Sequence, residues 1–213
     1  AGFGQTEVAR YFVATLVCRQ LTGAWVIWEL SFLIRTGRLS AQLLRPFPPI
    51  YVQALWMLTA MPFRLVILSP LIAGLVWWRP DLLVFPGGPA LGLTVLSLAL
   101  AWLLNFLVQV CFGLLAFWVD RSDGVFALWT SLWFLLSGYV APLAFFPDGW
   151  QTALRWLPFR ATLAVPVELL GGFLDPAQAG PDLLRQAAWV VVAWLAASAL
   201  WTRGLARYGA FGA

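Results

Sequence analysis

The chain has 213 residues, of which 62% are hydrophobic and 10% are charged, and it carries a formal net charge of +4. A soluble domain is about 45–50% apolar and about 25% charged, so this composition leaves too few polar residues to cover a water-soluble body, and a soluble protein is excluded. A lipid bilayer is the remaining solvent for so apolar a surface.

Five stretches are long and apolar enough to form a helix across the hydrocarbon core, which requires about 20 residues. They cover residues 8–28, 52–78, 90–118, 125–143 and 184–201. Tryptophans such as Trp78 and Trp201 lie near their ends, where the amphipathic indole ring prefers the headgroup layer. We therefore predict an all-α polytopic membrane protein, in which residues 1–213 form a single transmembrane domain built as a helical bundle of five spans.

Residues 34–46, which follow the first predicted span, have the pattern of a short amphipathic helix. Leu39, Leu43 and Leu44 fall on one face at helical spacing. Gly37 separates this segment from the preceding helix, and a proline ends it. The pattern predicts a helix that lies along the membrane surface.

Arginines surround this amphipathic segment at Arg35, Arg38 and Arg45. Their density favours a cytoplasmic position, because loops rich in arginine stay on the cytoplasmic side. Taken alone, the segment is also typical of an interfacial anchor whose arginines contact lipid phosphates.

Strongly polar side chains lie inside the predicted spans at Arg19, Arg64, Asn105 and Gln109. A charge at the centre of the bilayer costs about 2.5–3.5 kcal/mol on insertion scales, so such residues usually face the interior of a bundle. Asn105 and Gln109 are four residues apart and share one helix face. Two interpretations remain open, namely hydrogen bonds between helices and the lining of a translocation path.

Residues 145–181 differ from an ordinary loop because Trp, Phe, Leu and Pro are frequent in them. The apolar pieces at 150–157 and 162–170 are too short to cross a bilayer. Short apolar pieces of this kind predict re-entrant or interfacial helices on the outer side, which other parts of the protein must cover.

Several residue types on which catalytic, metal-binding and nucleotide-binding sites depend are absent or few. The chain has no histidine, which excludes His-based acid–base catalysis and His-containing metal sites. All 13 basic residues are arginine, so the chain lacks the lysine of a phosphate-binding P-loop. The two cysteines, Cys18 and Cys111, lie in apolar stretches and are expected to be separate buried thiols. The arginines form no basic stripe, which argues against a nucleic-acid partner.

Five short runs are spread over nearly the whole chain: IRTGRLSAQLLRP, VDRSDG, SGYVAPLAFFPDGW, LPFRATLAVP and GLARYGAFGA. Together they resemble the membrane-spanning permeases of the ABC type-2 exporter family. That family has six spans, both ends in the cytoplasm, a cytoplasmic coupling helix and a re-entrant pair of helices before the last span. The resemblance implies that the five spans correspond to the second to sixth of the family and that the first is missing here.

The resemblance also implies partners and sites. The chain would be a multi-pass permease of the cell's inner membrane, paired with an identical or different second permease and surrounded by lipids. Separate ATPase subunits would carry the ATP and Mg²⁺, and this chain would hold no cofactor, metal or catalytic residue. The residues expected to contact the ATPase are Arg35, Arg38, Leu39, Leu43, Leu44, Arg45, Asp120 and Arg121. The residues expected to line the path are Arg19, Arg64, Asn105 and Gln109.

Three other classes of membrane protein compete with this one. An intramembrane enzyme lacks suitably placed carboxylates, because the aspartates fall in connections. A proton- or ion-coupled secondary carrier usually relies on buried Asp, Glu or His relays, and only Glu29, near a membrane interface, is available for that role. A non-transporting structural subunit of a membrane complex stays open.

Overall fold

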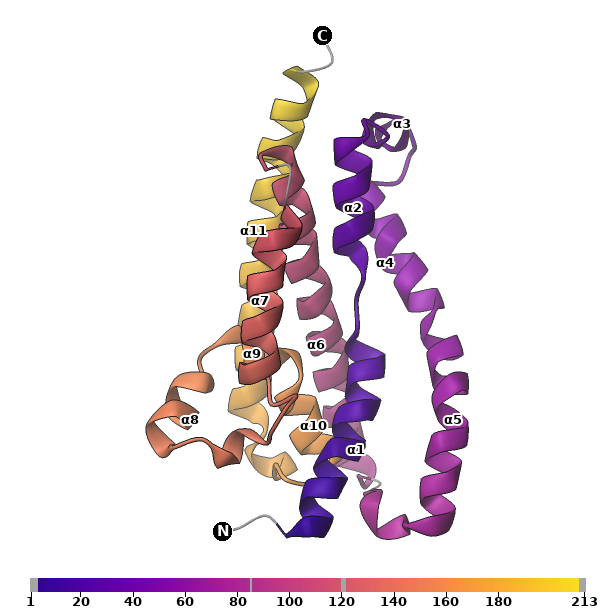
Figure 1. The fold of residues 1–213 in the computed structure, drawn as a ribbon, viewed down its shortest axis with the longest axis vertical. Coiled ribbons are helices and arrows are strands. Elements are labelled where there is room, and N and C mark those ends of the chain that lie inside the picture. Colours follow the sequence, from indigo (N-terminus) through magenta and orange to yellow (C-terminus); the bar gives the residue numbers. More distant parts are fainter. Residues whose placement is uncertain (1–3, 85, 120–121, 211–213) are drawn as a thin grey trace.

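The structure, a computed structural model, describes residues 4–84, 86–119 and 122–210. Every regular element in these ranges is a helix, which confirms the prediction of an all-α membrane bundle. The bundle is elongated, with the start of α1 (Gln5–Thr22) at one end and the short helix α3 (Leu39–Leu43) at the other (Figure 1). The end of the bundle that holds α3 also contains the last turns of α11 (Gly180–Ala210), and we call it the α3 end.

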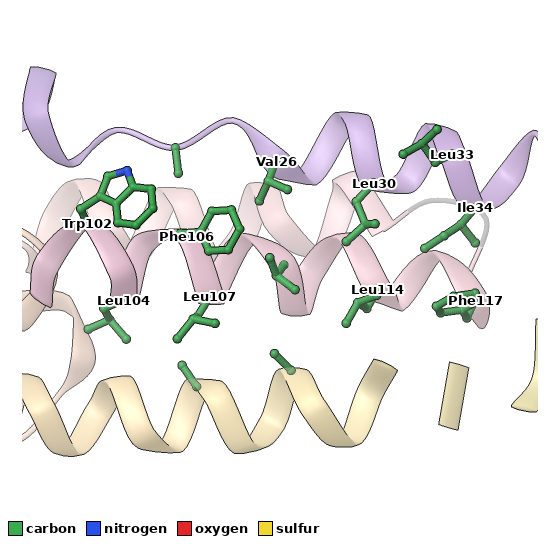
Figure 2. Close-up of a cluster of buried hydrophobic side chains, with 14 of the residues drawn as sticks. Val26, Leu30, Leu33, Ile34, Trp102, Leu104, Phe106, Leu107, Leu114 and Phe117 are labelled. Carbon is green, nitrogen blue, oxygen red and sulfur yellow. The ribbon is translucent and has the colours of Figure 1, made fainter. Parts of the chain in front are cut away.

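Helix α6 (Gly88–Leu114) forms the centre of the bundle and continues into the short helix η2 (Leu115–Phe117). Helices α2 (Val26–Arg35) and α11 flank it, and their facing side chains form the main core (Figure 2). Leu30 and Val110 in this core are completely buried. Lipid tails are as apolar as these side chains, so close van der Waals packing holds the helices together.

A small residue permits the close approach of α2 and α6. A Cβ atom on Gly113 would lie 3.1 Å from Cβ of Leu30 and 3.4 Å from Cα of Ile27. Only glycine leaves room for the neighbouring backbone at such a distance, as is common where membrane helices cross.

The substitution Gly113→Val should therefore separate α2 from α6 and destabilise the fold by about 1–3 kcal/mol, the usual cost of overpacking. Thermal unfolding in detergent, followed by circular dichroism, measures the effect. Gly92→Val on the same helix is the matched control, because nothing lies within 4 Å of its Cβ position. Equal losses in the two variants would contradict the packing argument.

The first predicted span, residues 8–28, is not one continuous helix. Helix α1 ends at Thr22 and α2 begins at Val26, with residues 23–25 between them in non-helical conformations. Glycine has a low helix propensity, and the backbone at Gly23 is extended. We call residues 23–25 the helix break.

Helices α4 (Pro49–Thr59) and α5 (Met61–Trp78) form one long bent rod that contains the second predicted span. The bend lies at Ala60, just before Pro62 in the first turn of α5. This rod stands apart from the other long helices over most of its length (Figure 1). Only 6% of its most apolar 18-residue stretch is buried. The short helix η1 (Pro80–Leu82) connects it toward α6.

Helix α7 (Ser122–Leu136) starts at the α3 end and stops about midway along the bundle (Figure 1). Its 15 residues are fewer than the predicted span 125–143 and fewer than the about 20 that a crossing requires. The chain then forms short helices in the half of the bundle away from α3. They are η3 (Leu143–Phe145), α8 (Asp148–Leu154), α9 (Pro158–Thr162), α10 (Ala164–Leu170) and η4 (Pro176–Gln178). Their entry into the bilayer as re-entrant helices stays a prediction.

Three helices among the described residues are long and apolar enough to cross a membrane: Pro49–Trp78, Gly88–Phe117 and Gly180–Tyr208. They contain the second and fifth predicted spans, and the third except for its last residue. Both cysteines are free; Cys18 is buried and Cys111 is half-buried. The expectation of two separate thiols is therefore confirmed.

Candidate functional site

The helix break exposes backbone carbonyl groups that polar side chains then satisfy. Nη1 of Arg64 on α5 donates to the carbonyl oxygen of Gly23 at 2.7 Å and to that of Gln20 at 3.3 Å. Nε2 of Gln109 on α6 donates to the carbonyl oxygen of Ala24 at 2.6 Å. These bonds replace the helical hydrogen bonds that the break removes.

Arg19 and Arg64 bring two positive charges to the break. A Cβ on Gly23 would lie 3.7 Å from Nη1 of Arg19 and 3.6 Å from Nη1 of Arg64, so the two guanidinium groups are close neighbours. The Arg19 guanidinium also lies 4.9 Å from the ring centre of Trp133 and 5.9 Å from that of Tyr139, within the range of cation–π attraction. In the described part of the chain, neither arginine forms an ion pair with a carboxylate.

Two adjoining cavities surround these groups. The larger, of about 710 Å³, lies between α1, α5 and the segment that follows α7. The smaller, of about 110 Å³, lies between the helix break, α6 and α7, and the two share Arg19 and Trp25. Arg64 lines the larger cavity, and Asn105 and Gln109 line the smaller one. The fold thus brings the four predicted path residues together, whereas their role in transport stays a prediction.

Asn105 also connects α6 to the short helices. Its Nδ2 donates to the carbonyl oxygen of Thr162 at 3.2 Å, and Nε1 of Trp133 donates to the hydroxyl oxygen of the same threonine at 2.8 Å. Thr162 ends α9, so α6 and α7 both hold α9 at the edge of the smaller cavity. Asn105 thus forms a hydrogen bond between helices, while the lining of a translocation path stays a prediction.

Replacing Gln109 by Leu should leave the Ala24 carbonyl without a donor and destabilise the protein by about 1–3 kcal/mol. The melting temperature in detergent, measured by circular dichroism, should fall accordingly. Gln178→Leu makes the same chemical change at an exposed position in η4 and should have little effect. An unchanged melting temperature in Gln109→Leu would show that this bond does not support the break.

A second polar cluster holds α9, α10 and α11 together in the half of the bundle away from α3. Arg160 bridges Glu168 at 2.6 Å and Asp182 at 2.8 Å, and Arg185 contacts the same aspartate at 2.6 Å. All four side chains are largely shielded from solvent. Burial raises the pKa of the Glu168 carboxyl above its ordinary value, and the Arg160 charge opposes this effect.

The sequence patterns indicated neither this cluster nor Trp133 and Thr162. Arg160 lies on the short helix α9 and Asp182 at the start of the long helix α11, 22 residues further along the chain. The available signal was the presence of opposite charges at both ends of the segment between Arg160 and Arg185.

Substituting Arg160 by Leu should leave the shielded Glu168 carboxylate without its partner, and Asp182 with Arg185 alone, at a cost of about 3–5 kcal/mol, as breaking buried ion pairs does. Thermal unfolding and the yield of monodisperse protein in detergent both measure the loss. Arg79→Leu removes an exposed arginine whose hydrogen bond lowers the pKa of Asp81, and serves as the control. Similar behaviour of the two variants would contradict a structural role for the shielded cluster.

Five residues predicted to contact an ATPase form an exposed surface at the α3 end. They are Arg35, Arg38, Leu43, Leu44 and Arg45, and we call them the α3 surface. Leu44 is 89% exposed, which is unusual for so apolar a side chain at the end of a bundle. Leu39 is also predicted to contact the ATPase, but it is completely buried in the main core. It fixes α3 to the rest of the bundle.

The α3 surface lies at the same end of the bundle as the last turns of α11 and the start of α7 (Figure 1). A Cβ on Gly37 would lie 3.8 Å from the hydroxyl oxygen of Tyr208, so the segment before α3 approaches α11. Arg38 lies with its guanidinium 5.3 Å from the ring centre of Phe32, which orients it beside α2. The other two predicted contact residues, Asp120 and Arg121, lie outside the described residues.

The comparisons with known proteins give one match. A sequence model of a protein family, described as ABC-2 family transporter protein, matches residues 1–212. No curated protein and no solved structure matches the chain significantly. The family match covers the helix break, the cavities and the α3 surface alike.

Proposed function

Because the chain belongs to the ABC-2 family of transporters, we propose that it is the permease subunit of an ATP-driven exporter. As a family member it is a membrane-embedded permease of an ABC transporter, the component that works with ABC ATPase subunits. The finer parts of the proposal are export as the direction of transport, a second permease that completes the path, and the cell's inner membrane as the location.

One observation carries this proposal: helix α2 connects the α3 surface directly to the helix break. Its 10 residues run from Val26 at the break to Arg35 at the α3 surface. It packs along α6 through fully buried side chains such as Ile27 and Leu30. A displacement applied at α3 can therefore reach the cavities through one rigid element.

The chemistry of the α3 surface supports docking of an ATPase subunit. Exposed leucines flanked by arginines match the composition of protein interfaces, in which apolar contacts form the centre and arginine is enriched. Leu39 fixes the base of α3 in the core, so force on Leu43 and Leu44 is passed into the bundle. The ATP and Mg²⁺ belong to the partner in this proposal.

The helix break supports a transport cycle because it can absorb a change of angle. Rigid helices that move relative to one another need a short segment whose backbone torsions change. Residues 23–25 provide that segment, and their carbonyls are held by side chains of α5 and α6 rather than by a continuous helix. Movement of α2 therefore alters the two cavities that meet at the break.

The outward-facing apolar surface supports lipids and a second permease as neighbours. The rod formed by α4 and α5 is almost entirely uncovered. On α7, Leu128, Leu132 and Leu135 are exposed on one face. A surface of this kind is stable in contact with lipid tails or another membrane helix.

The double substitution of Leu43 and Leu44 by Asp should abolish docking, because two charges would replace the apolar centre of the α3 surface. We expect the affinity for the ATPase subunits, measured by co-purification and by titration with the isolated ATPase, to fall at least about tenfold, which is 1.4 kcal/mol. ATP-driven transport by the reconstituted complex should fall with it, while the melting temperature stays unchanged.

Leu43→Met with Leu44→Met keeps the surface apolar and is the matched control. Unchanged binding and transport in the Asp variant would contradict the proposed coupling. Transport that needs no ATPase would instead indicate a secondary carrier, and an assembled complex without any transport would indicate a structural subunit.

A further inference from the structure

The larger cavity holds two positive charges that no carboxylate in the described residues neutralises. The terminal nitrogens of Arg19 and Arg64 converge on the same point beside Gly23, at 3.7 and 3.6 Å from its Cβ position. No Asp or Glu is among the described residues that line either cavity. The charges are therefore concentrated on one wall, at the place where the two cavities meet.

The existing contacts of these arginines are weaker than an ion pair. Arg64 donates to carbonyl oxygens of Gln20 and Gly23, which carry only partial charges. Arg19 lies over the rings of Trp133 and Tyr139, which attract a cation without neutralising it. Two like charges so close together favour an anion between them.

The N-terminal end of α2 adds to the positive electrostatic potential of the two arginines. Helix α2 begins at Val26, directly after the break, and the start of a helix carries a partial positive charge. Trp25 and Trp28 place this end at the smaller cavity. The arginines supply the formal charge, and the helix end acts in the same direction.

The rest of the larger cavity is apolar. Phe12, Leu16 and Val140 line it, together with Trp25, and all four are more than two-fifths exposed. A volume of about 710 Å³ is within the usual range of small-molecule sites. The cavity thus combines one cationic wall with several apolar walls.

We propose that this cavity binds an amphipathic organic anion, with a phosphate or carboxylate between Arg19 and Arg64 and an apolar body against Phe12, Leu16 and Trp25. Arginine suits this role because its planar group donates two parallel hydrogen bonds to either anion. This inference rests on the proposed function, since it names the class of cargo that the permease would accept. The anion can come from a lipid headgroup or from a soluble aromatic compound.

The test uses the full chain in nanodiscs of zwitterionic phosphatidylcholine and two anionic probes. Naphthyl phosphate, followed by equilibrium dialysis, represents a soluble aromatic anion. Phosphatidic acid added to the nanodisc, followed by its retention on the purified protein, represents a lipid anion. Saturable binding of at least one probe is expected, and which of them binds identifies the source.

Arg19→Gln and Arg64→Gln should each weaken binding at least about tenfold, because each removes a charge-assisted contact. Glutamine at residue 64 can still donate a hydrogen bond to the break, which favours folding. Arg79→Gln, at an exposed arginine outside the cavities, should bind like the unmodified chain. Melting temperatures of all variants report whether they fold.

A measurement without substitutions keeps the inference testable if a variant fails to fold. The unmodified chain should bind naphthylmethanol, which is neutral, and naphthylmethyl trimethylammonium, which is cationic, at least about tenfold more weakly than the bound anion. Equal binding of these probes, no saturable binding of either anion, or full affinity in both folded glutamine variants would overturn the inference.

Parallel titration with the ATPase subunits separates this inference from the proposed function. Docking of the ATPase without binding of an anion would reject the cargo class and leave the permease proposal intact. Binding of an anion without docking would reject ATP-driven transport and leave the cavity as an anion site.

Discussion

The need to satisfy the backbone polar groups of an interrupted helix governs the arrangement of this protein. A helix that stops leaves its last carbonyl groups without a helical donor. At the helix break those of Gly23 and Ala24 receive donors from Arg64 and Gln109. The interruption is stable only because α5 and α6 bring these side chains to it, and the cavities form around the same residues. The polar residues of the site are thus also structural residues.

The two ends of the bundle are held by different interactions. Close apolar packing joins α2 to α6 near the α3 end, where glycine allows the backbones to approach. The half away from α3 is joined by ion pairs of Arg160 with Glu168 and Asp182 and by hydrogen bonds to Thr162. The helix break lies between these two held regions, so it is the natural place for relative motion.

The arrangement of two held regions with the helix break between them can be related to the chain's membership of the ABC-2 transporter family. A permease that is driven by another subunit needs a contact surface, a rigid connection and a cavity that responds. In the proposed function these parts are the α3 surface, helix α2 and the helix break, which are consecutive in the chain. On that proposal, a short segment at the end of the bundle acts through α2 on residues near its middle.

Hydropathy and periodicity alone predicted the all-α membrane fold, the arginine-bearing surface segment at 34–46 and the short helices within 145–181, because these features depend only on neighbouring residues. They also singled out Arg19, Arg64, Asn105 and Gln109, because polar groups stand out in apolar helices. The helix break, the early end of α7, the burial of Leu39 and the Arg160 cluster could not be read in this way. They depend on contacts between residues far apart in the chain, which local patterns do not encode, and so only the tertiary structure decided them.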